Sequence, residues 1–269
     1  MQTIGSLLNN FFTHKDFLPP ADQLAGTLFT PLHLVFAACA LAVTVFAFLK
    51  AAKWEEKKLQ RIYAVLWLLV VVLELTKIVW ETLSGKSVNF EWGGMLPLYP
   101  CSIFMYAMPF AIWGKGLVRK AACGYVCSLG LLGGAINFIY PANILGAYSC
   151  ISFAGMHTFF YHGTLVFCAI SMMLSSYYDP RWVKKAWHLL VPAIPCFVVS
   201  LVANAVNFSP IDSDYMFFKL ESFFFAPLGK ATADWLSVVI VYLIYALIHA
   251  LPSLPFYFKN RKAAKTVSV

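Results

Sequence analysis

The feature that most constrains this chain is a series of long stretches in which apolar residues follow one another without interruption, as from Val65 to Leu73. An α-helix needs about 20 predominantly apolar residues to cross the hydrocarbon core of a bilayer. A transmembrane strand instead alternates apolar and polar residues over about ten positions. The continuous runs therefore predict an all-α, polytopic membrane protein and exclude a transmembrane barrel.

Seven windows of suitable length can be drawn along the sequence. They predict a single bundle of seven transmembrane helices over residues 29–256, with an interfacial N-terminal segment at 1–28 and a basic cytoplasmic tail at 257–269. The third window is the shortest and contains Pro97 and Pro100, so we expect its helix to begin late. The windows cover residues 29–50, 62–83, 97–113, 120–140, 154–176, 186–206 and 233–256.

The composition agrees with a membrane protein. Of the 269 residues, 61% are hydrophobic and 12% are charged, whereas soluble domains have about 25% charged residues. This excludes a disordered chain, a nucleic-acid-binding module and an enzyme of the aqueous phase. The seven cysteines lie mostly inside apolar runs, which favours small buried side chains over a disulfide framework.

The distribution of Lys and Arg predicts the orientation. Fifteen of the twenty lie in the linkers after windows one, three and five and in the C-terminal tail, and four lie on the opposite side. Because cytoplasmic loops are enriched in Lys and Arg, we expect the N-terminus outside and the C-terminus in the cytoplasm of a multi-pass protein of the cell membrane.

Polar residues inside the windows fall in the halves that this orientation assigns to the outer leaflet. Ionisable side chains in a membrane normally face the bundle interior or water, so a shared depth predicts one polar chamber. The alternative is that each residue marks a helix end at the headgroups. The residues are His33, Lys77, Glu81, Cys101, Ser102, Asn137, His157, His162, Asn204, Asn207 and Asp234.

Glu74, Lys77 and Glu81 form a stripe on one face of the second window, with the spacing i, i+3, i+7. Between two carboxylates the Lys77 ammonium can stay charged in the membrane. The stripe is either a structural ion pair that fixes helix packing or a site that handles substrate. Together with Asp234 it would also suit the translocation path of a transporter.

Cys101 and His162 are the candidate catalytic residues. Pro100 is predicted to start the third helix, which places Cys101 in its first turn, where the helix N-terminus stabilises a thiolate. His162 lies at a similar depth in the fifth window, so its imidazole can take the thiol proton if the two helices are neighbours. The alternative for Cys101 is one more small apolar residue.

Three further residues are predicted to support this pair. Asn137 and Ser102 are candidates for an oxyanion hole. His157 is about 140° from His162 on the helix and is expected to line the rim or cap a carbonyl. We expect no metal, because no His or Cys set with tetrahedral spacing is present. The aromatic segment 216–225, within the loop 207–232, is either a lid or a membrane anchor.

The same motifs resemble a known family. Glu74 with Lys77, the segments 96–102 and 133–141, and Tyr161-His-Gly163 are similar to the YwaF-like bacterial integral membrane proteins and to their relative, the transmembrane protein 164 acyltransferase. The resemblance covers most of the chain. It implies a Cys/His acyl-transfer site at Cys101 and His162. Where this sequence has Tyr-Pro-Cys-Ser, the animal protein has a Pro-Cys-His pattern, a departure that concerns the substrate more than the nucleophile.

The expected function is therefore that of a membrane acyltransferase, which moves a fatty acyl group between lipids through a covalent thioester. Its expected partners are phospholipids or lysophospholipids and the bilayer, with no nucleic acid and no cofactor. A bacterial cytoplasmic membrane suits the resemblance. The alternatives are a lipid hydrolase with the same site, a small-solute or ion transporter that uses the intramembrane Glu and Lys residues, and a noncatalytic lipid-binding or assembly subunit.

Overall fold

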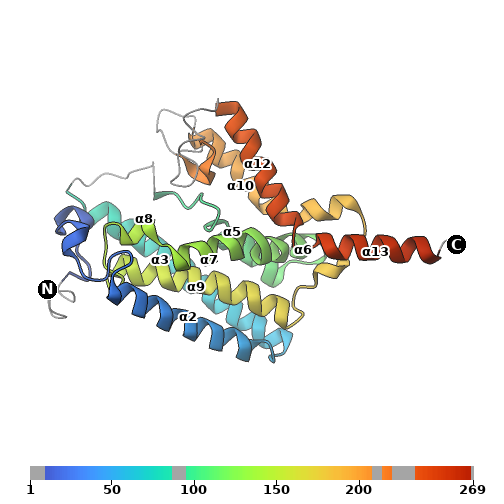
Figure 1. Ribbon diagram of the computed structural model, residues 1–269, viewed down its shortest axis with the longest axis horizontal. Coiled ribbons are helices and arrows are strands. Elements are labelled where there is room, and N and C mark those ends of the chain that lie inside the picture. The colour runs from blue at the N-terminus through green and yellow to red at the C-terminus, as the bar shows by residue number, and fades with distance from the viewer. Residues whose placement is uncertain (1–9, 87–94, 208–213, 220–233, 268–269) are drawn as a thin grey trace.

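The computed structural model describes residues 10–86, 95–207, 214–219 and 234–267, and this part of the chain consists of helices joined by turns (Figure 1). The all-α prediction is confirmed, since no strand occurs within the described residues. The main helices are α2 (Pro31–Ala51), α3 (Glu56–Ser84), α5 (Ile103–Trp113), α6 (Gly116–Tyr125), α7 (Leu131–Ile139), α9 (Phe153–Leu174), α10 (Ile194–Asn207), α12 (Asp234–Ala250) and α13 (Leu254–Val267).

Shorter elements connect these helices. The π-helix η3 (Val126–Gly130) joins α6 to α7 without a break, so the two form one long helix with a bulge in the middle. α8 (Ala142–Leu145) and the 3-10 helices η1 (Lys15–Phe17), η2 (Ala21–Gln23), η4 (Pro180–Trp182), η5 (Ala186–Ala193) and η6 (Tyr215–Phe217) complete the described part.

Five helices in the described residues are long and apolar enough to cross a membrane, and six are if α12 and α13 form one span bent by 61°. Each predicted window contains a helix, but the count of seven spans is not confirmed. α5 has 11 residues and is therefore about 16 Å long, while the hydrocarbon core measures about 30 Å. The orientation of the termini stays a prediction.

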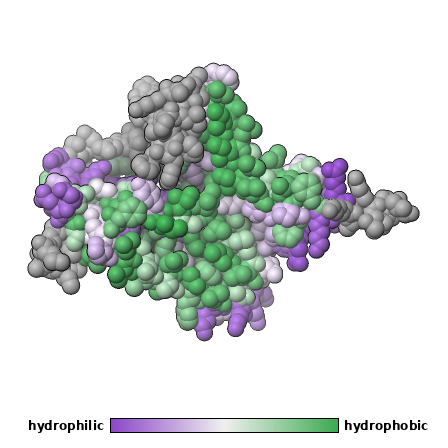
Figure 2. Space-filling model, in the orientation of Figure 1, coloured by the Kyte–Doolittle hydropathy of each residue, from purple (hydrophilic) through white to green (hydrophobic). Residues whose placement is uncertain are grey.

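α9 is the central helix of the bundle. In its most apolar stretch 72% of the residues are buried, compared with 6% in α2 and 11% in α3. Val43 and Phe46 on α2 and Val65 and Val72 on α3 present apolar side chains to the outside. Figure 2 shows hydrophobic residues across the middle of the molecule and hydrophilic residues gathered at its ends. A soluble monomer rarely exposes such a surface, whereas lipid requires it.

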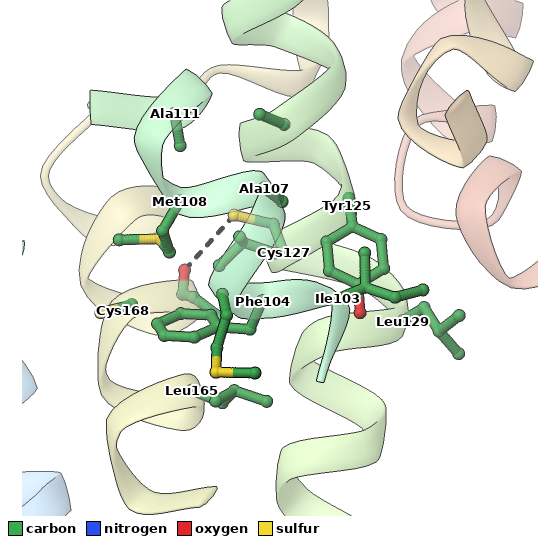
Figure 3. Packing of buried hydrophobic residues seen from close by; sticks show 14 of the residues in the cluster. Ile103, Phe104, Ala107, Met108, Ala111, Tyr125, Cys127, Leu129, Leu165 and Cys168 are labelled. Carbon is green, nitrogen blue, oxygen red and sulfur yellow. Dashed lines mark hydrogen bonds between the residues drawn. The ribbon is translucent and has the colours of Figure 1, made fainter. Parts of the chain in front are cut away.

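The core lies between α9, α5 and the helix formed by α6, η3 and α7 (Figure 3). Phe104 and Met108 of α5 pack with Leu165 and Cys168 of α9, and all four side chains are buried. The Cys127 thiol at the π-helix donates a 3.5 Å hydrogen bond to the Ala169 carbonyl oxygen of α9. All seven cysteines are free, and five of them are buried.

The described part of the N-terminal segment packs against the ends of α3 and α9. Trp80 of α3 donates its indole N–H to the Phe12 carbonyl, and the Phe153 amide of α9 donates to the Phe11 carbonyl. The Phe12 and Phe17 side chains remain exposed. Residues 1–9 lie outside the described residues, and the interfacial location of the segment stays a prediction.

Candidate functional site

The intramembrane charges form two pairs rather than one stripe. Lys77 Nζ lies 3.6 Å from Glu81 Oε2 on the same helix, as the i, i+4 spacing indicates. Glu74 Oε2 instead lies 3.1 Å from His157 Nε2 across the interface between α3 and α9. Both pairs are mostly buried, with side-chain exposures between 5% and 17%. The sequence spacing shows the first pair and cannot show the second.

Cys101 lies in the turn that leads into α5. The Ser102 amide donates to the Tyr99 carbonyl, and the Phe104 amide donates to the Cys101 carbonyl. These i to i+3 bonds form a 3-10 type of turn, so the α-helix begins at Ile103 rather than at Pro100. The sequence predicted Cys101 in the first turn of this helix, whereas the structure places it just before that turn.

Two tyrosine hydroxyls hold this turn. Tyr125, at the end of α6, donates to the Pro100 carbonyl. Tyr161 of α9 donates to the Cys101 carbonyl at 3.4 Å. Tyr161 is the ninth of the 22 residues of α9, so Cys101 lies near the middle of the bundle. Tyr161 directly precedes His162, so this contact brings Cys101 and His162 to a similar level of the bundle.

The Gly133-Gly134 pair of α7 connects Cys101 with α9. A β-carbon at Gly133 would lie 3.8 Å from Cys101 Cβ, and one at Gly134 would lie 3.0 Å from Leu165 Cβ and 3.3 Å from the His162 carbonyl oxygen. Gly134 thus permits a close approach of α7 to α9, whereas Gly133 leaves room for a methyl group beside Cys101. Cys101 therefore lies next to Gly133, and the His162 backbone lies next to Gly134, at consecutive positions of α7.

His162 is buried and its tautomer follows from its contacts. Its Nδ1 atom lies 2.8 Å from the Thr158 carbonyl oxygen, which can only accept, so Nδ1 carries the hydrogen. Nε2 then has a free lone pair, and it has no hydrogen-bond partner among the described residues. A buried imidazole with a free Nε2 has the form that a general base requires. Nε2 is not hydrogen-bonded to Cys101 in this state.

Electrostatic interactions join the cluster. Glu74 interacts with both Cys101 and His162, and His157 and Lys77 also interact with His162. Cys101, His162, Glu74, Lys77 and His157 therefore form one group inside the bundle, which we call the Cys101 cluster. Its charged members come from α3, and its histidines come from α9.

The other predicted polar residues are placed differently. Ser102 is buried beside Cys101, and Asn137 donates its amide to the Gly133 carbonyl at 3.0 Å. Asn204 donates to the Tyr242 hydroxyl, while Asn207 binds the backbone of Tyr215 with both amide atoms. The predicted single chamber therefore does not include α10. The Asp234 side chain and residues 220–225 of the aromatic segment lie outside the described residues.

A second buried cluster was not predicted from the sequence. Ser128 of the π-helix and His249 of α12 lie 2.6 Å apart, between Oγ and Nδ1, and the Tyr125 ring is 5.6 Å from the His249 ring. We call Tyr125, Ser128 and His249 the His249 cluster. Single π-turns within α-helices often occur at functional sites. No sequence signal reveals it, since Ser128 and His249 lie in unrelated apolar windows.

The part of the chain that the structure describes contains no candidate metal site. Within residues 10–86, 95–207, 214–219 and 234–267, no three His, Cys, Asp or Glu side chains come together as metal ligands would. The chemistry that these side chains offer is proton transfer and nucleophilic attack.

These observations define a multi-pass helical membrane protein with a cysteine, histidines and carboxylates gathered inside the bundle. The sequence model of the TMEM164 family matches residues 28–259, and the chain belongs to this family. No protein of curated function and no solved structure matches the chain. The narrower likeness to YwaF-like bacterial proteins stays a resemblance.

Proposed function

We propose that the protein is an acyltransferase in which Cys101 accepts a fatty acyl group from a membrane phospholipid and passes it to a lysophospholipid. The observation that supports this most strongly is the tautomer of His162. Its Nδ1–H is held by the Thr158 carbonyl, which leaves Nε2 as a bare, buried proton acceptor. The backbone of His162 and Cys101 both approach the glycine pair of α7.

The reaction would begin with a neutral thiol. The Glu74 carboxylate opposes a free thiolate on Cys101 but stabilises the imidazolium that forms when His162 takes a proton. Proton transfer would therefore accompany attack. The sulfur forms a bond to the ester carbonyl carbon, the bond to the glycerol oxygen breaks, and the His162 proton moves to that oxygen. The products are a thioester on Cys101 and a lysophospholipid.

The second half reverses these roles. The acceptor hydroxyl gives its proton to His162 Nε2 and attacks the thioester carbon, and the cysteine sulfur leaves and regains the proton. Ser102, buried next to Cys101 in the chain, would help to stabilise the oxyanion. Asn137 already donates one amide hydrogen to Gly133 and has a second to offer. A water in place of the lysolipid would give the hydrolase.

The charge pairs bear on the transporter alternative. Glu74 is engaged by His157, and Lys77 by Glu81, so the carboxylates that a translocation path would use already have partners in this state. The pair Glu74–His157 holds α3 against α9. In the acyltransferase it orients the helix that carries His162.

Intact-mass analysis after incubation with phospholipid vesicles tests the proposal. Wild type is expected to gain the mass of one acyl group, and Cys101→Ala is expected to gain none. Cys39→Ala is the matched control, because it removes an exposed thiol on α2 that is not part of the Cys101 cluster. This variant should still form the adduct. An adduct on Cys101→Ala would contradict the mechanism.

His162→Asn isolates the base. The Asn amide can still donate to the Thr158 carbonyl as Nδ1 does, while the Nε2 acceptor is lost. We expect thioester formation to slow by about 10² to 10⁴, the usual contribution of a general base. Product analysis then separates the two reactions, since transfer yields a new phospholipid and hydrolysis yields free fatty acid.

A further inference from the structure

An apolar groove of about 320 Å³ lies between α5, α6 and α10. Its floor consists of three small buried residues, Ala107, Ala121 and Ala122. Phe110, Val118 and Val198 form its walls and are each more than half exposed. The lining offers only apolar atoms, so the groove has nothing with which to hold water or an ion.

The groove is continuous with the lipid-facing surface. Its exposed walls carry the same kind of side chains as the outer faces of α2 and α3. An apolar cavity of about 150 Å³ suffices to bind benzene, and this groove is about twice as large. Its occupant in a bilayer is therefore expected to be hydrocarbon.

The shape of the groove explains why one chain would stay in it. Lipid tails are as apolar as leucine, so burial alone gives no preference for the protein over the bilayer. Affinity must come from close contacts, each worth about 0.1 to 0.2 kcal/mol. A chain between three helices makes more of these contacts than a chain against the flat outer face of α2 or α3.

The two ends of the groove differ. Tyr106 is the fourth residue of α5 and comes five residues after Cys101, so its end of the groove lies toward the Cys101 cluster. Leu117 and Ile194 border the opposite end, at the starts of α6 and α10. Lys115, Arg119 and Lys120 flank Leu117 in the sequence and mark this second end as the one at the membrane surface. A chain along the groove would thus have its ester end there and its methyl end near Tyr106.

We propose that this groove binds one acyl chain of a membrane phospholipid, with the ester end between Leu117 and Ile194 and the methyl end at Tyr106. The binding does not depend on the proposed chemistry at Cys101. It gives the protein a lipid site of its own on the side of α5 that faces the bilayer.

The test uses the full-length protein in nanodiscs that contain a phospholipid with a photoreactive group near the end of one acyl chain. After illumination, labelled residues are mapped by mass spectrometry. Labels are expected on residues 106–110, 121–122 and 198–199. Val198→Trp fills the groove from its exposed wall and should lower this labelling about tenfold, the loss expected when roughly ten carbon–carbon contacts disappear.

Leu201→Trp is the matched control, because Leu201 is exposed on the same helix and does not line the groove. It should label as wild type does. Cys101→Ala should also label fully, so a failed acyltransferase assay would leave the groove proposal intact. Equal labelling of Val198→Trp and wild type, or labels spread evenly over α2 and α3, would overturn it.

Discussion

The histidines of the two buried clusters have different electrostatic surroundings. In the Cys101 cluster, His157 faces the Glu74 carboxylate and His162 keeps a free Nε2 within electrostatic reach of the same charge. In the His249 cluster, the hydrogen-bond partner of His249 among the described residues is the neutral Ser128 hydroxyl, which also donates to the Gly124 carbonyl. Charge inside the described bundle is therefore concentrated between α3 and α9.

The difference in surroundings indicates which of the two clusters can support proton transfer. An imidazole that accepts a proton needs a nearby negative charge to stabilise the cation, and the Cys101 cluster supplies one. The His249 cluster supplies hydroxyl and carbonyl dipoles only, which suit a neutral ring that holds α12 against the π-helix. The two regions should therefore respond unequally to the loss of their polar groups.

The largest effect is expected for Glu74→Ala. It leaves His157 without its carboxylate in a buried site, and breaking a buried pair costs about 3 to 5 kcal/mol of folding free energy. Thermal unfolding in detergent, followed by size-exclusion chromatography, measures the loss. Thr76→Ala on the exposed face of α3 is the control. Equal shifts in the two variants would mean that the Glu74 pair does not hold α3 to α9.

The glycine pair gives a second, smaller effect on the wall of the Cys101 cluster. Gly134→Ala places a methyl group 3.0 Å from Leu165 Cβ and forces α7 away from α9, at a cost of about 1 to 3 kcal/mol. Gly133→Ala meets its nearest neighbour at 3.8 Å and should keep or raise stability, since Ala favours a helix. The same unfolding assay compares them. A stable Gly134→Ala protein would show that the helices can separate without cost.

Helix positions could be predicted from the sequence because long apolar runs leave few alternatives. The window 154–176 corresponds to α9 at Phe153–Leu174, and 29–50 to α2 at Pro31–Ala51. The start of α5 could not be predicted this way. Pro97 and Pro100 fit either an early helix or a turn, and contacts of that turn with Tyr125 and Tyr161 decide between them.

The candidate site was predictable only in part for the same reason. Spacing within a helix pairs Lys77 with Glu81, but the partner of Glu74 depends on how α3 and α9 are rotated against each other. Counting residues from window ends gave Cys101 a depth similar to that of His162, but it could not show the two tyrosine contacts that hold its turn. The π-helix leaves no periodic signal, so Ser128 and His249 stayed unnoticed.

The turn that carries Cys101 accepts hydrogen bonds from Tyr125 of the His249 cluster and from Tyr161 of α9, which allows a third comparison. Tyr125→Phe removes a hydrogen bond within a fully buried site and should cost about 1 kcal/mol. Tyr161→Phe removes a bond of 3.4 Å and should cost less than that. Both rings keep their packing, so unfolding temperatures report the hydroxyls alone. A larger loss for Tyr161→Phe would place the main support of the turn on α9.

The smallest effect is expected in the His249 cluster. His249→Phe keeps a buried ring beside Tyr125 and leaves the Ser128 hydroxyl bonded to the Gly124 carbonyl at 2.6 Å. Only one neutral hydrogen bond is lost, at a cost of about 0.5 to 1.5 kcal/mol, and burying Phe in place of His offsets part of it. Acyl-adduct formation on Cys101 should continue, because no charge of the Cys101 cluster changes. If His249→Phe abolished the adduct while the protein stayed folded, the proton acceptor would have to be sought at the π-helix instead of on α9.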